Sequence, residues 1–166
     1  MTKLRLKRSL SLALVITAIA SMTVLTWGCG ADNKKTEKNP QVLDIMSEIK
    51  KTMDVSEMTE VKEDKLKKLF DIDPNDIDEY GIYISSSNIE ASEVGIIKVK
   101  DASAANGIKD KIEKRIQQQS SSFKDYLPDE YELLQNHVLK VKDKYIFYVV
   151  SKDADKIENT FDGFFK

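Results

Sequence analysis

The run Tyr145–Val150 (YIFYVV) sets the strongest limit on the fold of this 166-residue chain. Every position is apolar or aromatic, and successive side chains of a strand point to opposite faces of a sheet. A strand with this pattern has to be covered on both faces, which predicts a central position in a sheet. The preceding run, Val138–Lys142, is separated from it only by Asp143 and Lys144, and this spacing predicts a tight β-hairpin.

The hairpin and the helix expected after it repeat a pattern found earlier in the chain. Two predicted strands, Tyr80–Ser85 and Val94–Lys100, precede a helix over 102–122, and each second strand enters its helix through Lys-Asp-Ala. The last helix begins after Asp153. Its apolar residues stand at helical spacing: Ile157, Phe161, Phe164 and Phe165. The sequence therefore predicts an α+β fold, with a mostly antiparallel four-stranded sheet from two strand-strand-helix units and helices packed on one face.

An N-terminal amphipathic helix is predicted before the sheet, over about 40–53. Asn39 is a good capping residue, and Pro40 suits the first helical position. The apolar residues that follow share one face of the helix: Val42, Ile45, Met46, Ile49 and Met53. A short helix over Asp64–Phe70 and a turn over Asp73–Glu79 then lead into the first strand.

The N-terminus has the layout of a secretory signal. Its first nine residues carry four cations and no acid, and Leu10–Thr26 carries no charge. Gly28 then precedes Cys29, the only cysteine, in an arrangement that resembles the lipobox of bacterial lipoproteins. The resemblance implies transfer of a diacylglyceryl group to the Cys29 thiol, cleavage before it, and acylation by fatty acids such as palmitate. Thr26 and Trp27 depart from the usual lipobox, so an uncleaved signal-anchor helix is the alternative.

These features divide the chain into a signal peptide over 1–28, a lipid-bearing tether over 29–39 and one globular domain over 40–166. Cations at the N-terminus hold that end inside, so both interpretations of Cys29 place the domain outside the cytoplasm. The signal holds four of the 26 Lys and Arg residues and none of the 28 Asp and Glu residues. An acidic domain lacks the positive surface of a nucleic-acid binder. The expected partners are the membrane, through the lipid, and an unidentified envelope protein or ligand.

One segment has a partial calcium-loop pattern. Asp71, Asp73 and Asn75 match loop positions 1, 3 and 5, but Asp76 replaces the glycine and Ile82 replaces the bidentate glutamate. The alternative is a helix N-terminus whose acids complement the helix dipole. One histidine and one cysteine cannot supply the ligands that a transition-metal site needs, so no cofactor is expected.

The segment Asp125–Tyr131 (DYLPDEY) combines tyrosines and acids beside a proline-fixed turn. Such loops suit recognition of a partner or a cationic ligand. The candidate partner-binding residues are Tyr126, Asp129, Glu130 and Tyr131. The alternative is a structural corner in which the tyrosines pack under the sheet.

Several of these segments together resemble a known family. They are Asp76–Tyr80, Glu93 at the entry of a strand, and Phe123–Tyr131 followed by Asn136. The chain is similar over about 40–165 to small lipoproteins of Gram-positive, clostridia-like bacteria, catalogued as a domain of unknown function. The resemblance implies an extracytoplasmic location and brings no assigned activity. We therefore expect a non-enzymatic binding module of the cell envelope. The alternatives are a small hydrolase that uses carboxylates and a calcium-dependent binding module.

Overall fold

The computed structural model describes residues 38–166 as one compact unit. The predicted signal, Cys29 and the tether as far as Glu37 lie outside the described residues. Five strands form one sheet in the order β1-β2-β3-β5-β4, and every neighbouring pair is antiparallel. The strands are β1 Met58–Glu60, β2 Ile77–Ser85, β3 Glu93–Val99, β4 Val138–Lys142 and β5 Tyr145–Val150. No helix within 38–166 is long and apolar enough to cross a bilayer.

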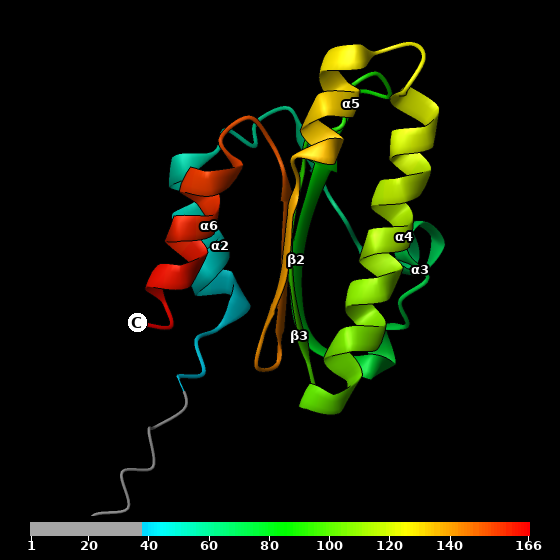
Figure 1. Cartoon of the computed structure of the whole chain (residues 1–166). Helices are drawn as coiled ribbons and strands as arrows, with labels where there is room; N and C mark the ends of the chain where they lie inside the picture. Colours follow the sequence, from blue (N-terminus) through cyan, green and yellow to red (C-terminus); the bar gives the residue numbers. More distant parts are fainter. Residues whose placement is uncertain (1–37) are drawn as a thin grey trace, which may run out of the picture. The chain divides into compact units, whose positions relative to one another are not determined.

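Helices cover both faces of the sheet (Figure 1), which corrects the prediction that they pack on one face. The five α-helices of the described part are α2 Val42–Thr52, α3 Glu63–Phe70, α4 Ala105–Phe123, α5 Pro128–Gln135 and α6 Ala154–Gly163. One hydrophobic cluster lies between the sheet and α3, α4 and α5, and a second lies between the sheet and α2 and α6. The physical reason is visible in β3 and β5, whose residues are all buried, so both of their faces need cover.

The sheet has one strand more than the four predicted. β1 is only three residues long and pairs with the last residues of β2, with Met58 opposite Ser85. It lies at the edge of the sheet and is half-buried, so it lacks the alternation and length that mark a strand in a sequence. The central position predicted for β5 is confirmed, because it pairs with β3 on one side and β4 on the other.

Two strand-strand-helix units are present as predicted, β2-β3-α4 and β4-β5-α6. In the first unit Asp101 accepts a hydrogen bond from the Ser103 amide (2.8 Å) and starts a single 3₁₀ turn, Ala102–Ala104, that leads into α4. In the second unit Asp153 occupies the same place before α6, but its side chain makes no capping hydrogen bond. The shared Lys-Asp-Ala sequence therefore produces two different helix starts.

The start of α2 differs from the prediction. Gln41, rather than Asn39, is the capping residue, and its side chain makes no capping bond. The orphan amide of Val42 instead donates to Glu79 Oε2 (2.8 Å), on the adjacent strand β2. A carboxylate at a helix N-terminus is favourable both as an acceptor and against the helix dipole. This cap joins residues far apart in the chain, and local sequence patterns do not encode it.

Gly95 is required by the packing of β3 against β5. Its cross-strand partner is Tyr148, and a Cβ at position 95 would lie 2.2 Å from Cε1 of the fully buried Tyr148 ring. Gly95→Ala is therefore expected to destabilise the domain by about 1–3 kcal/mol or more, because the ring has no room to move. The measurement is chemical unfolding of the purified protein.

Gly107→Ala is the matched control for this prediction. Gly107 lies in α4, and a Cβ there would meet no atom within 4 Å. Alanine in a helix is more favourable than glycine by roughly 0.5–1 kcal/mol, so this variant is expected to be unchanged or more stable. Equal effects of the two substitutions would contradict the assigned role of Gly95.

Candidate functional site

A groove of about 680 Å³ opens at the end of the sheet where β2 and β5 finish and β3 begins. The residues after α2, the end of β2, the β2–β3 loop, the start of α5 and the end of β5 all contribute to its walls. It forms because these elements end at the same edge of the sheet, so that their terminal polar residues come together. The volume is within the range typical of ligand sites.

The groove is strongly acidic. Its walls carry five carboxylates, four serine hydroxyls and a single lysine, Lys152. The carboxylates are Asp54, Glu57, Glu90, Glu130 and Asp153. Within residues 38–166 none of the five forms an ion pair, whereas acids elsewhere in the domain, such as Glu79, Glu93 and Glu158, do. Carboxylates gathered in a concave surface without neutralising cations create a negative potential that attracts positive charge.

Hydrogen bonds fix part of this wall. Glu130 Oε2 accepts from the Ala91 amide (2.7 Å) and so joins the start of α5 to the β2–β3 loop. Glu90 Oε2 accepts from Ser85 Oγ (2.8 Å) across the same loop. Asp54 accepts from the Ser56 amide (2.9 Å), and this hydrogen bond lowers the pKa of the Asp54 carboxyl below its usual value. Three of the five carboxylates are therefore held in place by hydrogen bonds from neutral groups.

A smaller cavity of about 290 Å³ adjoins the groove and shares Leu133, Ser151 and Lys152 with it. It adds three further acids from α5 and the start of α6: Asp129, Glu132 and Asp155. The negative surface thus continues from the groove along the side of the domain where α5 faces the first turn of α6.

The structure separates the four residues predicted to bind a partner. Glu130 lies in the groove and Asp129 in the adjoining cavity. Tyr126 is 84 % exposed in the turn between α4 and α5, whereas Tyr131 is half-buried against the hydrophobic core. Tyr131 thus packs as the structural-corner alternative predicts, whereas partner binding by the exposed residues of the segment stays a prediction.

The other groove acids were missed by the sequence interpretation. Asp54 and Glu57 lie in the loop between α2 and β1, Glu90 in the β2–β3 loop and Asp153 in the β5–α6 loop, and no motif connects these three loops. Their shared signal is position, because each follows the predicted end of a helix or strand. The order of the strands in the sheet was needed to recognise that the ends of these helices and strands lie at the same edge of the sheet.

The residues of the partial calcium loop have structural contacts. Asp71 ends α3 with a left-handed backbone (φ 57°), and its carbonyl accepts from Lys111 Nζ (2.5 Å). Asp73 accepts from the amide of Asn75 (2.9 Å) and begins a 3₁₀ turn, while Lys67 lies 3.8 Å away. Among residues 38–166 no group of three His, Cys, Asp or Glu side chains is arranged to hold a metal ion.

A separate polar cluster is buried beneath α4. Glu93, 2 % exposed, accepts from Arg115 through both of its oxygens and from Gln119 Nε2 (2.8 Å). Burial raises the pKa of Glu93, while Arg115 acts in the opposite direction. The Tyr148 hydroxyl is enclosed beside this carboxyl, and burial raises its pKa well above the usual value, although the contact lacks hydrogen-bond geometry. Glu93 and Tyr148 are closed to solvent, and the cluster fastens α4 to the sheet.

A third cluster fastens the point where the chain enters the domain. Lys98, 6 % exposed, donates to Glu79 Oε1 (2.5 Å), and this bond raises the pKa of Lys98. The Tyr145 hydroxyl lies 2.6 Å from the Pro40 carbonyl oxygen and 2.9 Å from Asn39 Oδ1. These contacts lie at the start of β5, at the opposite end of the sheet from the groove.

The antiparallel sheet between two helical layers, with a polar groove at one end, defines the chain as a small α+β domain. The chain belongs to the family DUF4358, a domain of unknown function, whose model matches residues 51–151. No curated protein and no solved structure matches it. The match confirms the resemblance to a family of unknown function. It runs from the end of α2 to the residue after β5, and includes twelve of the groove positions from Thr52 to Ser151.

Proposed function

We propose that this protein is a lipid-anchored, extracytoplasmic binding module of the cell envelope and that the acidic groove is its binding site. The observation that carries the proposal is the groove itself, with five carboxylates that have no cationic partner within residues 38–166. Glu93, which is buried, and Glu79, which is half-buried, instead form ion pairs with Arg115 and Lys98. The groove is where acids gather without a cationic partner within residues 38–166.

The position of the groove supports its role in a tethered protein. The chain enters the domain at Lys38–Pro40, next to Tyr145, and the groove lies beyond the other end of β5. At about 3.3 Å per residue, the strand separates the two sites by roughly 20 Å. A lipid on Cys29 would attach the domain by its entry end, so the groove would be free to face a partner away from the bilayer.

An enzymatic function for the acids is less well supported. A general acid needs a carboxyl with a raised pKa in contact with substrate. Burial raises the pKa of Glu93, but this carboxyl is enclosed under α4 and already accepts from Arg115 and Gln119. It lines none of the cavities described above. A binding module therefore fits the available groups better than a hydrolase.

The test of this proposal uses the full chain in intact cells. Metabolic labelling with a fatty acid is expected to mark the wild type and to be lost in Cys29→Ser, because the thiol is the acceptor. A photoreactive residue at Ser56, exposed in the groove, is expected to cross-link a partner or ligand. The same residue at Ser103, exposed near the entry end, is the control and is expected to give no specific adduct.

Two results would contradict the proposal separately. An unlabelled wild type would exclude the lipid anchor. Equal adducts from both positions, or none from Ser56, would exclude the groove as the binding site.

A further inference from the structure

We infer that the groove end of the domain is a docking surface for a basic polypeptide segment that also carries apolar side chains. The inference rests on the proposed function and specifies the chemistry of its partner. Two features of this end of the domain support it: exposed apolar side chains on segments next to the groove, and acids in the groove that have no cationic partner within residues 38–166.

Two of the three exposed large hydrophobic residues of the described part are at this end. Ile89 is 60 % exposed in the β2–β3 loop, and Tyr126 is 84 % exposed in the turn between α4 and α5. The hydrogen bond between Glu130 and Ala91 joins the β2–β3 loop to the first turn of α5, which directly follows the α4–α5 turn (Figure 1). Tyrosine and isoleucine at such positions offer apolar contact area to a partner.

The charge of the adjacent groove determines which partner would fit. Five acids line the groove and three more the adjoining cavity, with Lys152 the single cation in both walls. Lysine or arginine side chains of a partner would complement this surface, and acidic partners would be repelled. A single small cation would leave most of these acids unpaired and would not use Ile89 or Tyr126.

A polypeptide fits the extent of the surface. The groove and the adjoining cavity share part of their walls and extend along α5. Ile89 directly precedes the groove residue Glu90, and Tyr126 lies in the turn that leads into α5. A segment with alternating basic and apolar residues could place its cations in the groove and its apolar side chains against Ile89 and Tyr126. Tyrosine also offers a ring face to a lysine or arginine.

The experiment measures binding of fluorescent peptides to the full chain, purified from membranes in detergent. The probe is a short peptide of lysine and leucine. One comparison peptide has serine in place of leucine, and the other has glutamate in place of lysine. We expect the lysine-leucine peptide to bind most tightly, the lysine-serine peptide more weakly and the glutamate peptide not at all. Binding should weaken as salt is added, since the charges are exposed and screened.

Two pairs of variants assign the binding to this surface. Glu57→Gln with Asp153→Asn removes two groove charges whose side chains make no ion pair within residues 38–166. We expect the variant to bind the lysine-leucine peptide at least about fivefold more weakly than the wild type. Its control, Glu63→Gln with Asp110→Asn, removes two exposed charges elsewhere.

The second pair of variants tests the apolar contacts. Ile89→Ser with Tyr126→Ser is expected to bind the lysine-leucine and lysine-serine peptides equally tightly. Leu43→Ser, at a residue 71 % exposed near the entry end, is its control.

Binding of the glutamate peptide, or wild-type affinity in the Glu57→Gln, Asp153→Asn variant, would overturn the inference. Self-association of the protein that this variant abolishes would also overturn it, because a second copy would then be the occupant. If Ser56 still cross-links a partner in cells while the lysine peptides do not bind, the partner chemistry is wrong and the proposed function stands. If Ser56 gives no cross-link in cells and the lysine peptides do not bind, the proposed function is contradicted as well.

Discussion

Arg115→Met will destabilise the domain by about 3–5 kcal/mol at neutral pH, the range for removing one partner of a buried ion pair. Arg115 donates to both oxygens of Glu93, and its guanidinium also lies 4.5 Å above the Phe70 ring. Methionine retains much of the apolar contact with Phe70 but leaves a 2 % exposed carboxylate without its cation. The measurement is chemical unfolding of the purified variant and wild type at the same pH.

The pH dependence of this loss identifies its cause. Burial already raises the pKa of Glu93 above its ordinary value of 4.5, and Arg115 is the principal group that opposes the rise. Without Arg115 the pKa in the folded state rises further. A raised carboxyl pKa contributes stability that is present below the unfolded-state value and is lost as the pH increases through the folded-state value. The variant should therefore recover much of its stability in acid, where Glu93 binds a proton.

Two further variants separate the buried charge from other effects of the substitution. Adding Glu93→Gln to Arg115→Met removes the unpaired charge and keeps an acceptor for Gln119, so part of the stability should return at neutral pH. Lys114→Met is the matched control. Lys114 is exposed on α4 and forms no ion pair within residues 38–166. Its substitution should therefore change the free energy of unfolding by no more than about 0.5 kcal/mol. A pH-independent loss in Arg115→Met would show that packing, rather than charge, is the cause.

The elements that were predicted correctly are those in which the spacing of apolar residues along the chain indicates which faces are buried. Val138–Lys142 was predicted with the bounds it has, and Tyr145–Val150 occupies the central position that its two apolar faces required. The same two faces also imply helices on both sides of the sheet. The one-face prediction followed the layout of the repeated units and did not apply this constraint to the whole fold. The edge strand β1 was missed because three half-buried residues carry no period.

The candidate site was harder to predict because it depends on contacts between distant parts of the chain. Glu130 was selected from a local segment, but its bond to Ala91 spans 39 residues. Asp54 and Asp153 meet at the groove only because α2 and β5 end at the same edge of the sheet. Glu93 was noted only as part of a family resemblance, and nothing in its neighbours indicated that Arg115, 22 residues later, would enclose it. Periodicity shows which face is buried, but not which loops become neighbours.

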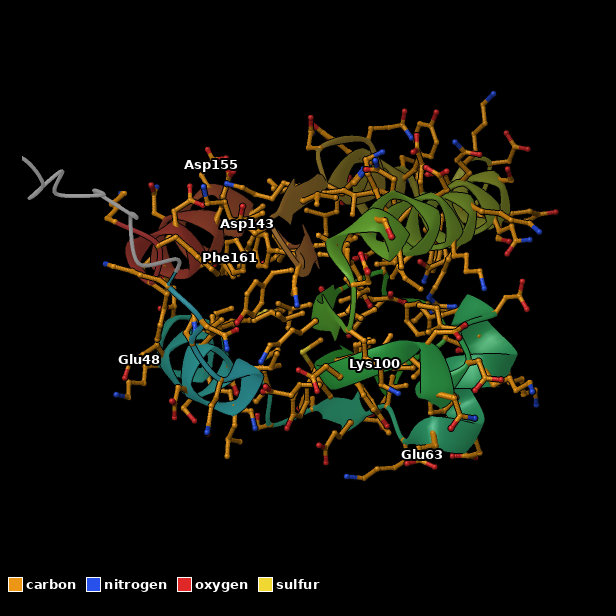
Figure 2. All side chains as sticks on the ribbon, turned by 90° about the horizontal axis from the view of Figure 1, so that it is seen from below. Glu48, Glu63, Lys100, Asp143, Asp155 and Phe161 are labelled. Carbon is orange, nitrogen blue, oxygen red and sulfur yellow. The ribbon has the colours of Figure 1, made fainter. Side chains whose placement is uncertain are left out.

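The last helix offers the second large effect, since Phe161→Ala is expected to cost about 3–5 kcal/mol. Phe161 is fully buried, stacks on Phe147 of β5 with ring centres 4.6 Å apart and lies 5.0 Å from Phe165. In Figure 2 Phe161 and Asp155 are on opposite sides of α6, as the amphipathic pattern predicts.

The control is Phe164→Ala, which removes a half-buried ring and should cost less. Both are measured by chemical unfolding. A terminal helix frays unless packing holds it, so the same substitution should expose α6 to hydrogen exchange before the rest of the domain. Equal losses in the two variants would mean that Phe161 does not anchor α6, and a loss below about 1 kcal/mol would remove it from the core.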